Sequence, residues 1–93
     1  MDPKAMRDHL KTLTKERTHA TLDAIYEVCQ AQVTRGISDF SISTIARLGE
    51  RRGVPKAQSI RNATGAHYRA LIESFAAAHP PKIDKNKVTK ADG

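Results

Sequence analysis

The stretch STIARLGERRGVPKAQSIRNATG, residues 43–65, decides the fold of this chain. It contains two short helical patterns that are separated by Gly-Val-Pro at residues 53–55. The first pattern places Ile45 and Leu48 on one side. It ends at Gly53, which can adopt the positive φ at which many helices end. The second pattern predicts a helix from Pro55 to Thr64. We therefore expect a supporting helix, a tight turn and a second helix packed across the first.

Apolar periodicity indicates that the N-terminal part of the chain is also helical. The longest stripe predicts a helix over residues 15–34, because its members fall within about 100° of a helical wheel. These members are Leu22, Ile25, Tyr26, Cys29 and Val33. An earlier stripe consists of Met6, Leu10 and Leu13. Asp2 is expected to cap that first helix, with Pro3 in its first turn. The two stripes are about 160° out of phase, so we expect a break near Thr14.

The segments after residue 35 complete the prediction of an all-α fold, a small bundle of four to five short helices. Phe40 and Ile42 are expected to fill the core from a connector that could form a very short strand. Ser43 stands where the supporting helix needs an N-cap. A last helix over residues 66–78 has one apolar face, and the prolines that follow His79 end it. That face consists of Tyr68, Leu71, Ile72 and Phe75.

Length and composition predict one domain over residues 1–79 and a basic flexible tail or linker over residues 80–93. The tail has too little apolar content to fold by itself. No apolar run approaches the ~20 residues that cross a bilayer, so we expect no membrane partner. The single cysteine, Cys29, lies on an apolar stripe and cannot form an internal disulfide. We therefore expect a buried thiol in a reducing, cytoplasmic compartment.

Basic residues are concentrated in the middle of the chain, which carries a formal net charge of +6. Residues 35–69 contain seven Lys or Arg and two acidic residues, whereas residues 18–34 contain two acidic residues and no Lys or Arg. A focused positive field of this kind attracts polyanions. Double-stranded DNA is the partner that we expect.

The second helix of residues 43–65 carries side chains suited to reading DNA. Three residues on one side are expected to face the core: Ala57, Ile60 and Thr64. Three polar residues lie opposite: Gln58, Ser59 and Asn62. Amide side chains can bond adenine N6 and N7, and a hydroxyl can bond either base type. Lys56 and Arg61 lie on the flanks, where cations suit phosphates. The sequence predicts that this helix enters the major groove.

Five further residues are candidates for DNA contact: Ser43, Arg51, Arg52, His67 and Arg69. Arg51 and Arg52 end the supporting helix, where the negative end of the helix dipole also explains them. His67 and Arg69 begin the last helix, whose first N–H groups could meet a phosphate. Two or three base contacts per chain are too few for high specificity, so we expect a homodimer or a second DNA-binding partner.

Residues 40–75, FSISTIARLGERRGVPKAQSIRNATGAHYRALIESF, resemble helix-turn-helix DNA-binding domains through Ile45-Ala46 and Gly53-Val54-Pro55. The step from Ala46 to Gly53 is about one helical turn longer than is common in such domains, and the step to Ile60 is also longer. Residues 22–75 resemble more narrowly the small protein of the gamma-mobile-trio, a set found with tyrosine-type recombinases on bacterial mobile elements. The most specific match is SIRNATGAHYRALI. This resemblance implies a bacterial protein that serves the integration, excision or control of such an element and has no catalytic residues. We therefore expect a sequence-specific double-stranded DNA-binding protein that acts as a transcriptional regulator or recombination accessory factor.

Other classes of function remain open on the sequence. A protein-interaction module could dimerise or dock to a recombinase through the apolar face of the last helix or through the Met6/Leu10/Leu13 helix. RNA binding is a further alternative. The histidines lack metal-ligand spacing, and no glycine-rich phosphate loop or suitably spaced acidic pair is present. We therefore expect no enzyme, no metal, no cofactor and no small-molecule substrate.

Overall fold

The computed structural model describes residues 2–79, which form five α-helices and two 3₁₀ turns without any strand. In chain order the elements are α1 (Pro3–Leu13), α2 (Glu16–Thr34), α3 (Ile42–Leu48), η1 (Glu50–Arg52), α4 (Ala57–Arg61), η2 (Ala63–Gly65) and α5 (Ala66–Ala78). The all-α prediction is confirmed. No helix in this part of the chain is long and apolar enough to cross a membrane. The predicted tail over residues 80–93 lies outside the described residues.

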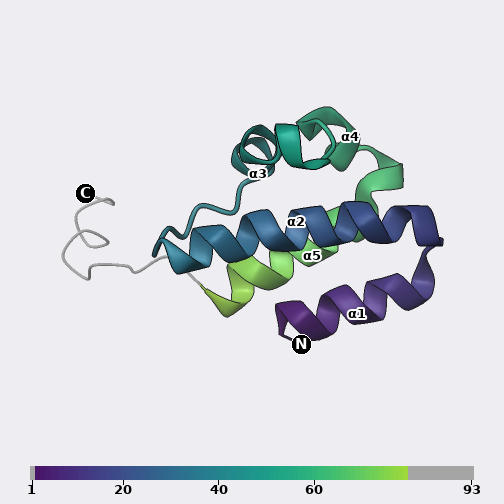
Figure 1. Cartoon of the computed structure of the whole chain (residues 1–93), viewed down its shortest axis with the longest axis horizontal. Helices are drawn as coiled ribbons and strands as arrows, with labels where there is room; N and C mark the ends of the chain where they lie inside the picture. The colour runs from purple at the N-terminus through teal and green to yellow at the C-terminus, as the bar shows by residue number, and fades with distance from the viewer. Residues whose placement is uncertain (1, 80–93) are drawn as a thin grey trace, which may run out of the picture.

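The helices form two layers around a central pair. Helices α2 and α5 pack against each other, and α1 contacts both of them from one side. On the opposite side, α3 contacts α2, α4 contacts α5, and α3 and α4 contact each other (Figure 1). The unit formed by α3, η1, α4 and η2 is therefore displayed on one side of a three-helix base.

The ends of α1 follow the local sequence as predicted. The Asp2 carboxylate accepts a hydrogen bond from the Ala5 backbone N–H at 2.9 Å, and Pro3 occupies the first position of the helix. Thr14 is extended and ends the helix, which confirms the predicted break. The His19 ring Nε2 then lies 2.7 Å from the Lys11 carbonyl, so α2 closes back onto the end of α1.

The core is centred on α2 and α5 and includes residues from all five helices and from the connector. The Phe75 ring lies 5.4 Å from Tyr26 and 5.8 Å from Phe40, measured between centroids, so Phe40 fills the core as predicted. Val28 and Gln32 are also buried, although they lie outside the predicted stripe of α2. Because α2 contacts α1, α3 and α5, it buries a wider arc than a helix packed on one neighbour.

Two leucines that the wheel placed inside are exposed. Leu13 is 56% exposed, because α1 is turned so that Arg7 faces the core side, with its guanidinium carbon 4.5 Å from the Tyr26 ring centroid. Leu48 is 39% exposed, because it is the last residue of α3. The chain turns back after Gly53, so Val54 packs against Gly49 and takes the place in the core that was expected for Leu48.

The N-cap of α3 is Ser41 and not Ser43, so that prediction is wrong. The Ser41 hydroxyl accepts a hydrogen bond from the Thr44 backbone N–H at 3.3 Å. The Asp39 carboxylate accepts from the Ser41 backbone N–H at 3.1 Å and from the Thr44 hydroxyl at 2.8 Å. These bonds begin the helix one half-turn earlier and lower the pKa of Asp39, the Ser41 backbone N–H being the main cause.

The extra turn between Ala46 and Gly53 has a structural explanation. α3 does not continue to Gly53 as predicted, since Gly49 interrupts it and the next residues form the 3₁₀ turn η1. Gly53 then has φ +93°, the left-handed conformation that was expected of it. Val54 is brought back against Gly49, where a Cβ would collide with its side chain.

Gly49→Ala should lower the free energy of unfolding by about 1–3 kcal/mol, because the added methyl overpacks the contact with Val54. The φ of Gly49 is −97°, so an alanine is not strained by its backbone conformation. Urea unfolding of the variant would measure the cost. In a Val54→Gly background, which removes both the Cβ and the Cγ2 that the methyl would meet, the same substitution should cost much less, and an equal cost in both backgrounds would contradict the contact.

Cys29 is fully buried, as predicted, and burial raises the pKa of its thiol from 9.0 to about 12. The folded chain therefore binds this proton more tightly than the unfolded chain. The resulting stability is complete below pH 9 and is lost as the pH rises towards 12. Cys29→Ala should lose less stability than the parent between pH 9 and 11 in urea unfolding under reducing conditions, and parallel losses would contradict the buried thiol.

Candidate nucleic-acid interface

Helix α4, the candidate reading helix, is shorter than the sequence predicts. It spans Ala57–Arg61, preceded by Lys56 in an extended conformation, whereas a helix from Pro55 to Thr64 was expected. Asn62 is also extended, and its carbonyl accepts hydrogen bonds from the Gly65 backbone N–H at 2.8 Å and from Arg69 at 2.7 Å. These bonds draw the chain out of the helix and into η2. Thr64 consequently lies on the surface and not in the core.

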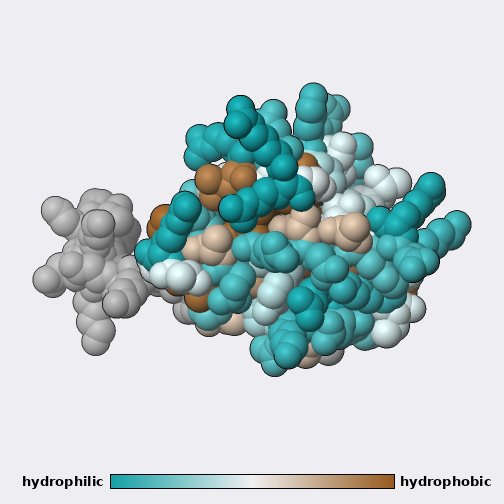
Figure 2. Space-filling view, viewed as in Figure 1, coloured by the Kyte–Doolittle hydropathy of each residue, from teal (hydrophilic) through white to brown (hydrophobic). Residues whose placement is uncertain are grey.

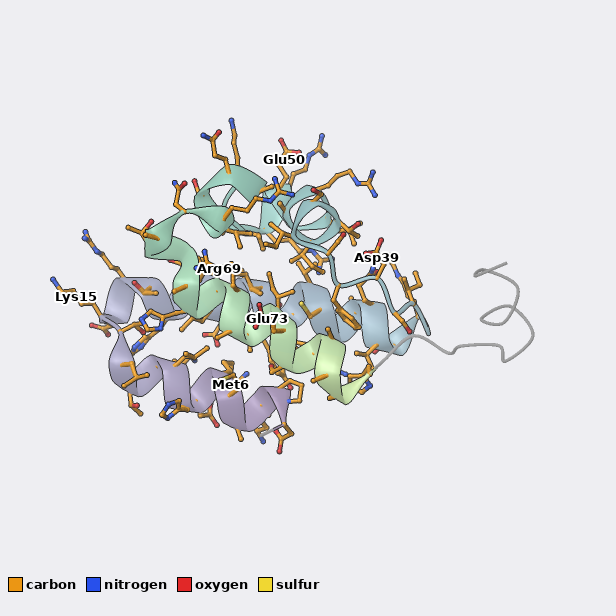
Figure 3. The ribbon with its side chains drawn as sticks, turned by 180° about the vertical axis from the view of Figure 1, so that it is seen from behind. Met6, Lys15, Asp39, Glu50, Arg69 and Glu73 are labelled. Atoms are coloured by element: carbon orange, nitrogen blue, oxygen red, sulfur yellow. The ribbon has the colours of Figure 1, made fainter. Side chains whose placement is uncertain are left out.

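Arg69 holds the end of α4 onto α5. Its Nη1 donates to the carbonyls of both Ile60 and Asn62, at 2.8 Å and 2.7 Å. Figure 3 shows the labelled Arg69 where α5 meets the segment that follows α4. A Cβ at Gly65 would collide with the Ile60 carbonyl, so this junction is also closely packed. Arg69 was a candidate for phosphate contact, but the structure places it as a support of α4.

The rotation of α4 agrees with the sequence analysis. The Ile60 side chain is 0% exposed and faces the core, while Ala57 is half-buried. All five residues that were expected on the outer side and flanks are exposed: Lys56, Gln58, Ser59, Arg61 and Asn62. The outer side of α4, together with Lys56 before it and Asn62 after it, therefore presents two amides, a hydroxyl and two cations.

Helix α3 contributes to the same surface through Ser43. Ser43 is an exposed residue inside α3, and its hydroxyl accepts a hydrogen bond from Arg61 Nη2 at 2.9 Å. This bond joins two residues that are eighteen positions apart in the sequence. It brings together two of the predicted contact residues and orients the Arg61 side chain towards α3.

The remaining candidates take separate positions. Arg51 and Arg52 are exposed on η1, beside the turn at Gly53. His67 is half-buried in the first turn of α5. Arg47 was not proposed as a contact, although it is exposed on α3 one turn after Ser43. Its signal in the sequence was this four-residue spacing, which places both side chains on one helical face.

Charge is divided between the two sides of the molecule. Residues 41–69 contain six Lys or Arg and one acidic residue, Glu50, whereas residues 2–40 contain six of each. In the described part of the chain, the ion pairs lie within α1 and between α1 and α2, such as Lys11 Nζ to Asp23 Oδ1 at 2.7 Å. None of them uses a cation of residues 41–69. Figure 2 shows hydrophilic side chains that project over α3 and α4, and the excess of Lys and Arg in residues 41–69 makes this side positively charged.

A hollow of about 220 Å³ lies between α3 and the start of α4. Six residues line it: Ala46, Arg47, Glu50, Val54, Lys56 and Ala57. Small apolar side chains form its floor, since Ala46 and Val54 are buried and Ala57 is half-buried. The charged residues of the lining are exposed. No pattern in the sequence predicted this hollow, because it depends on how α3 and α4 are packed together.

No protein-family model, curated protein or solved structure matches the chain. The resemblances to helix-turn-helix domains and to the gamma-mobile-trio protein therefore stay predictions. Function has to be inferred from the side chains that α3 and α4 display.

Arg69→Met should loosen α4 selectively, because it leaves two carbonyls without their charged donor. Hydrogen bonds from charged groups contribute about 1.5–3 kcal/mol, so the free energy of unfolding should fall by an amount of that order. Amide hydrogen exchange should accelerate at residues 57–62 more than in α1 or α2. Arg52→Met, at an exposed arginine, is the matched control. Equal acceleration throughout the chain would contradict a local role for Arg69.

Proposed function

We propose that this chain binds double-stranded DNA sequence-specifically and lays the outer side of α4 in the major groove. The observation that carries the proposal is the orientation of α4, in which Ile60 is buried while Gln58, Ser59 and Asn62 are exposed between two cations. Amide side chains can bond adenine N6 and N7 in pairs, and serine can bond either base type. Lys56 and Arg61 suit the flanking phosphates.

The charge distribution supports the same partner. The cations of residues 41–69 take part in no ion pair within residues 2–79, and they outnumber the two nearby carboxylates, those of Glu50 and of Asp39 just before α3. Such a surface gains affinity for DNA by releasing the counterions that are condensed on the phosphates. Arg51 and Arg52 are exposed on η1 and would extend these contacts along the backbone.

The short length of α4 limits how much sequence one chain can read. Five residues extend about 7.5 Å, which covers roughly two base pairs. Few base contacts of this kind discriminate weakly, so a useful site needs a second chain or a partner on neighbouring DNA. A transcriptional regulator or a recombination accessory factor of a mobile element fits this requirement.

The other classes of function have less support. The apolar faces that were expected to dock a protein are largely used inside the molecule, since Leu71, Ile72 and Phe75 of α5 and Leu10 of α1 are buried, although Leu13 is exposed. Single-stranded RNA is recognised largely by aromatic stacking. Here Phe40 and Phe75 are buried in the core, and both tyrosines are half-buried.

Selection from random duplexes, followed by fluorescence anisotropy, should give a preferred sequence and an affinity that falls steeply with salt. Gln58→Ala and Asn62→Ala should relax the preference, each by about 1–3 kcal/mol against the wrong base. Lys56→Ala should weaken all duplexes alike and reduce the salt slope by about one.

Lys4→Ala is the charge-matched control, because Lys4 is exposed on α1, on the opposite side from α3 and α4. It should change the affinity far less than Lys56→Ala. Equal affinity of the parent chain for every duplex would contradict sequence-specific binding. An equal loss of affinity in Lys56→Ala and Lys4→Ala would contradict the assignment of the binding surface to α3 and α4.

A further inference from the structure

The hollow between α3 and the start of α4 points to a specific contact with the DNA. We propose that it receives the 5-methyl group of a pyrimidine, and this rests on the DNA binding proposed above. The group is present on thymine and on 5-methylcytosine. The hollow would then add a second kind of readout to the hydrogen bonds of Gln58 and Asn62.

The lining suits a small apolar group. Its floor consists of the side chains of Ala46, Val54 and Ala57, of which the first two are 8% and 6% exposed. Its volume of about 220 Å³ lies below the roughly 300–1,000 Å³ that is usual for small-molecule sites. A methyl group would contact this floor and lose water on doing so, which is favourable.

The charged residues of the hollow surround an apolar floor, which suits a base edge that lies between phosphates. Glu50 belongs to the lining, is exposed, and forms no ion pair within residues 2–79. Its carboxylate disfavours a phosphate placed directly beside it. Arg47 and Lys56 are exposed cations of the same lining and can hold the phosphates on either side of the base. The hollow is therefore complementary to an apolar group that has an anion on either side of it.

The position of the hollow agrees with this occupant. Ala57 belongs to the lining and directly precedes Gln58, so the hollow opens at the first turn of α4. Base edges are commonly contacted by the N-terminal residues of a helix in the major groove. In that groove the 5-methyl of thymine is the apolar group that an unmodified base pair presents.

Uracil substitution tests the contact, because it removes the methyl group and keeps every hydrogen-bonding atom of thymine. In the selected duplex, replacing thymines one at a time should weaken binding about fourfold at the one or two positions that meet the hollow, with other positions unchanged. In a second experiment, a cytosine takes the place of the thymine at such a position. The duplex with 5-methylcytosine there should bind more tightly than the duplex with cytosine, by a similar factor.

Ala57→Leu should cover the apolar floor of the hollow and abolish the difference between thymine and uracil, while the salt slope stays that of the parent. Ala63→Leu adds the same side chain at an exposed position of η2 and should keep the difference. Thermal unfolding of both variants would show that they are folded. Equal affinity for thymine and uracil at every position would overturn the methyl contact and leave DNA binding standing, whereas failure to bind any duplex would overturn both proposals.

Discussion

The direction in which α4 displays its side chains depends on the burial of Ile60. A helix of five residues is too short to be stable by itself, so its orientation comes from what it is packed against. The Ile60 side chain is inaccessible to solvent, and its carbonyl accepts a hydrogen bond from Arg69 of α5. The side chain and the backbone of one residue thus hold α4 from two directions. Because Ile60 is held in the core, Gln58 and Asn62 on the opposite side face the solvent.

The three-helix base of α1, α2 and α5 supports this unit, and the positive excess lies on the other side of the molecule. Helices α1, α2 and α5 enclose the aromatic contacts of Phe75, and Arg7 and Lys11 on α1 lie close to Asp23 on α2. Acidic and basic residues therefore offset each other over residues 2–40. The positive excess remains on α3, η1 and α4, where the exposed amides lie. Charge and hydrogen-bonding groups on one rigid surface are the combination that DNA recognition requires.

The longer helices were predictable to within about one residue, because each is specified by several local signals at once. An apolar stripe of five residues marks α2, Asp2 and Pro3 mark the start of α1, and the prolines after His79 mark the end of α5. The short helices were predicted less well. Ser41 and Ser43 are both acceptable caps, and the choice between them was made by Asp39, which bonds to Ser41 and Thr44.

The sequence alone predicted that Gln58 and Asn62 point away from the core, because periodicity places them opposite Ile60. It also determined the charge of that region, which is a property of composition. Only the tertiary structure decided where α4 ends, that Arg69 supports it, and that Arg47 and Lys56 line one hollow. These features depend on contacts between residues far apart in the chain, and helical periodicity describes only neighbours within a few turns.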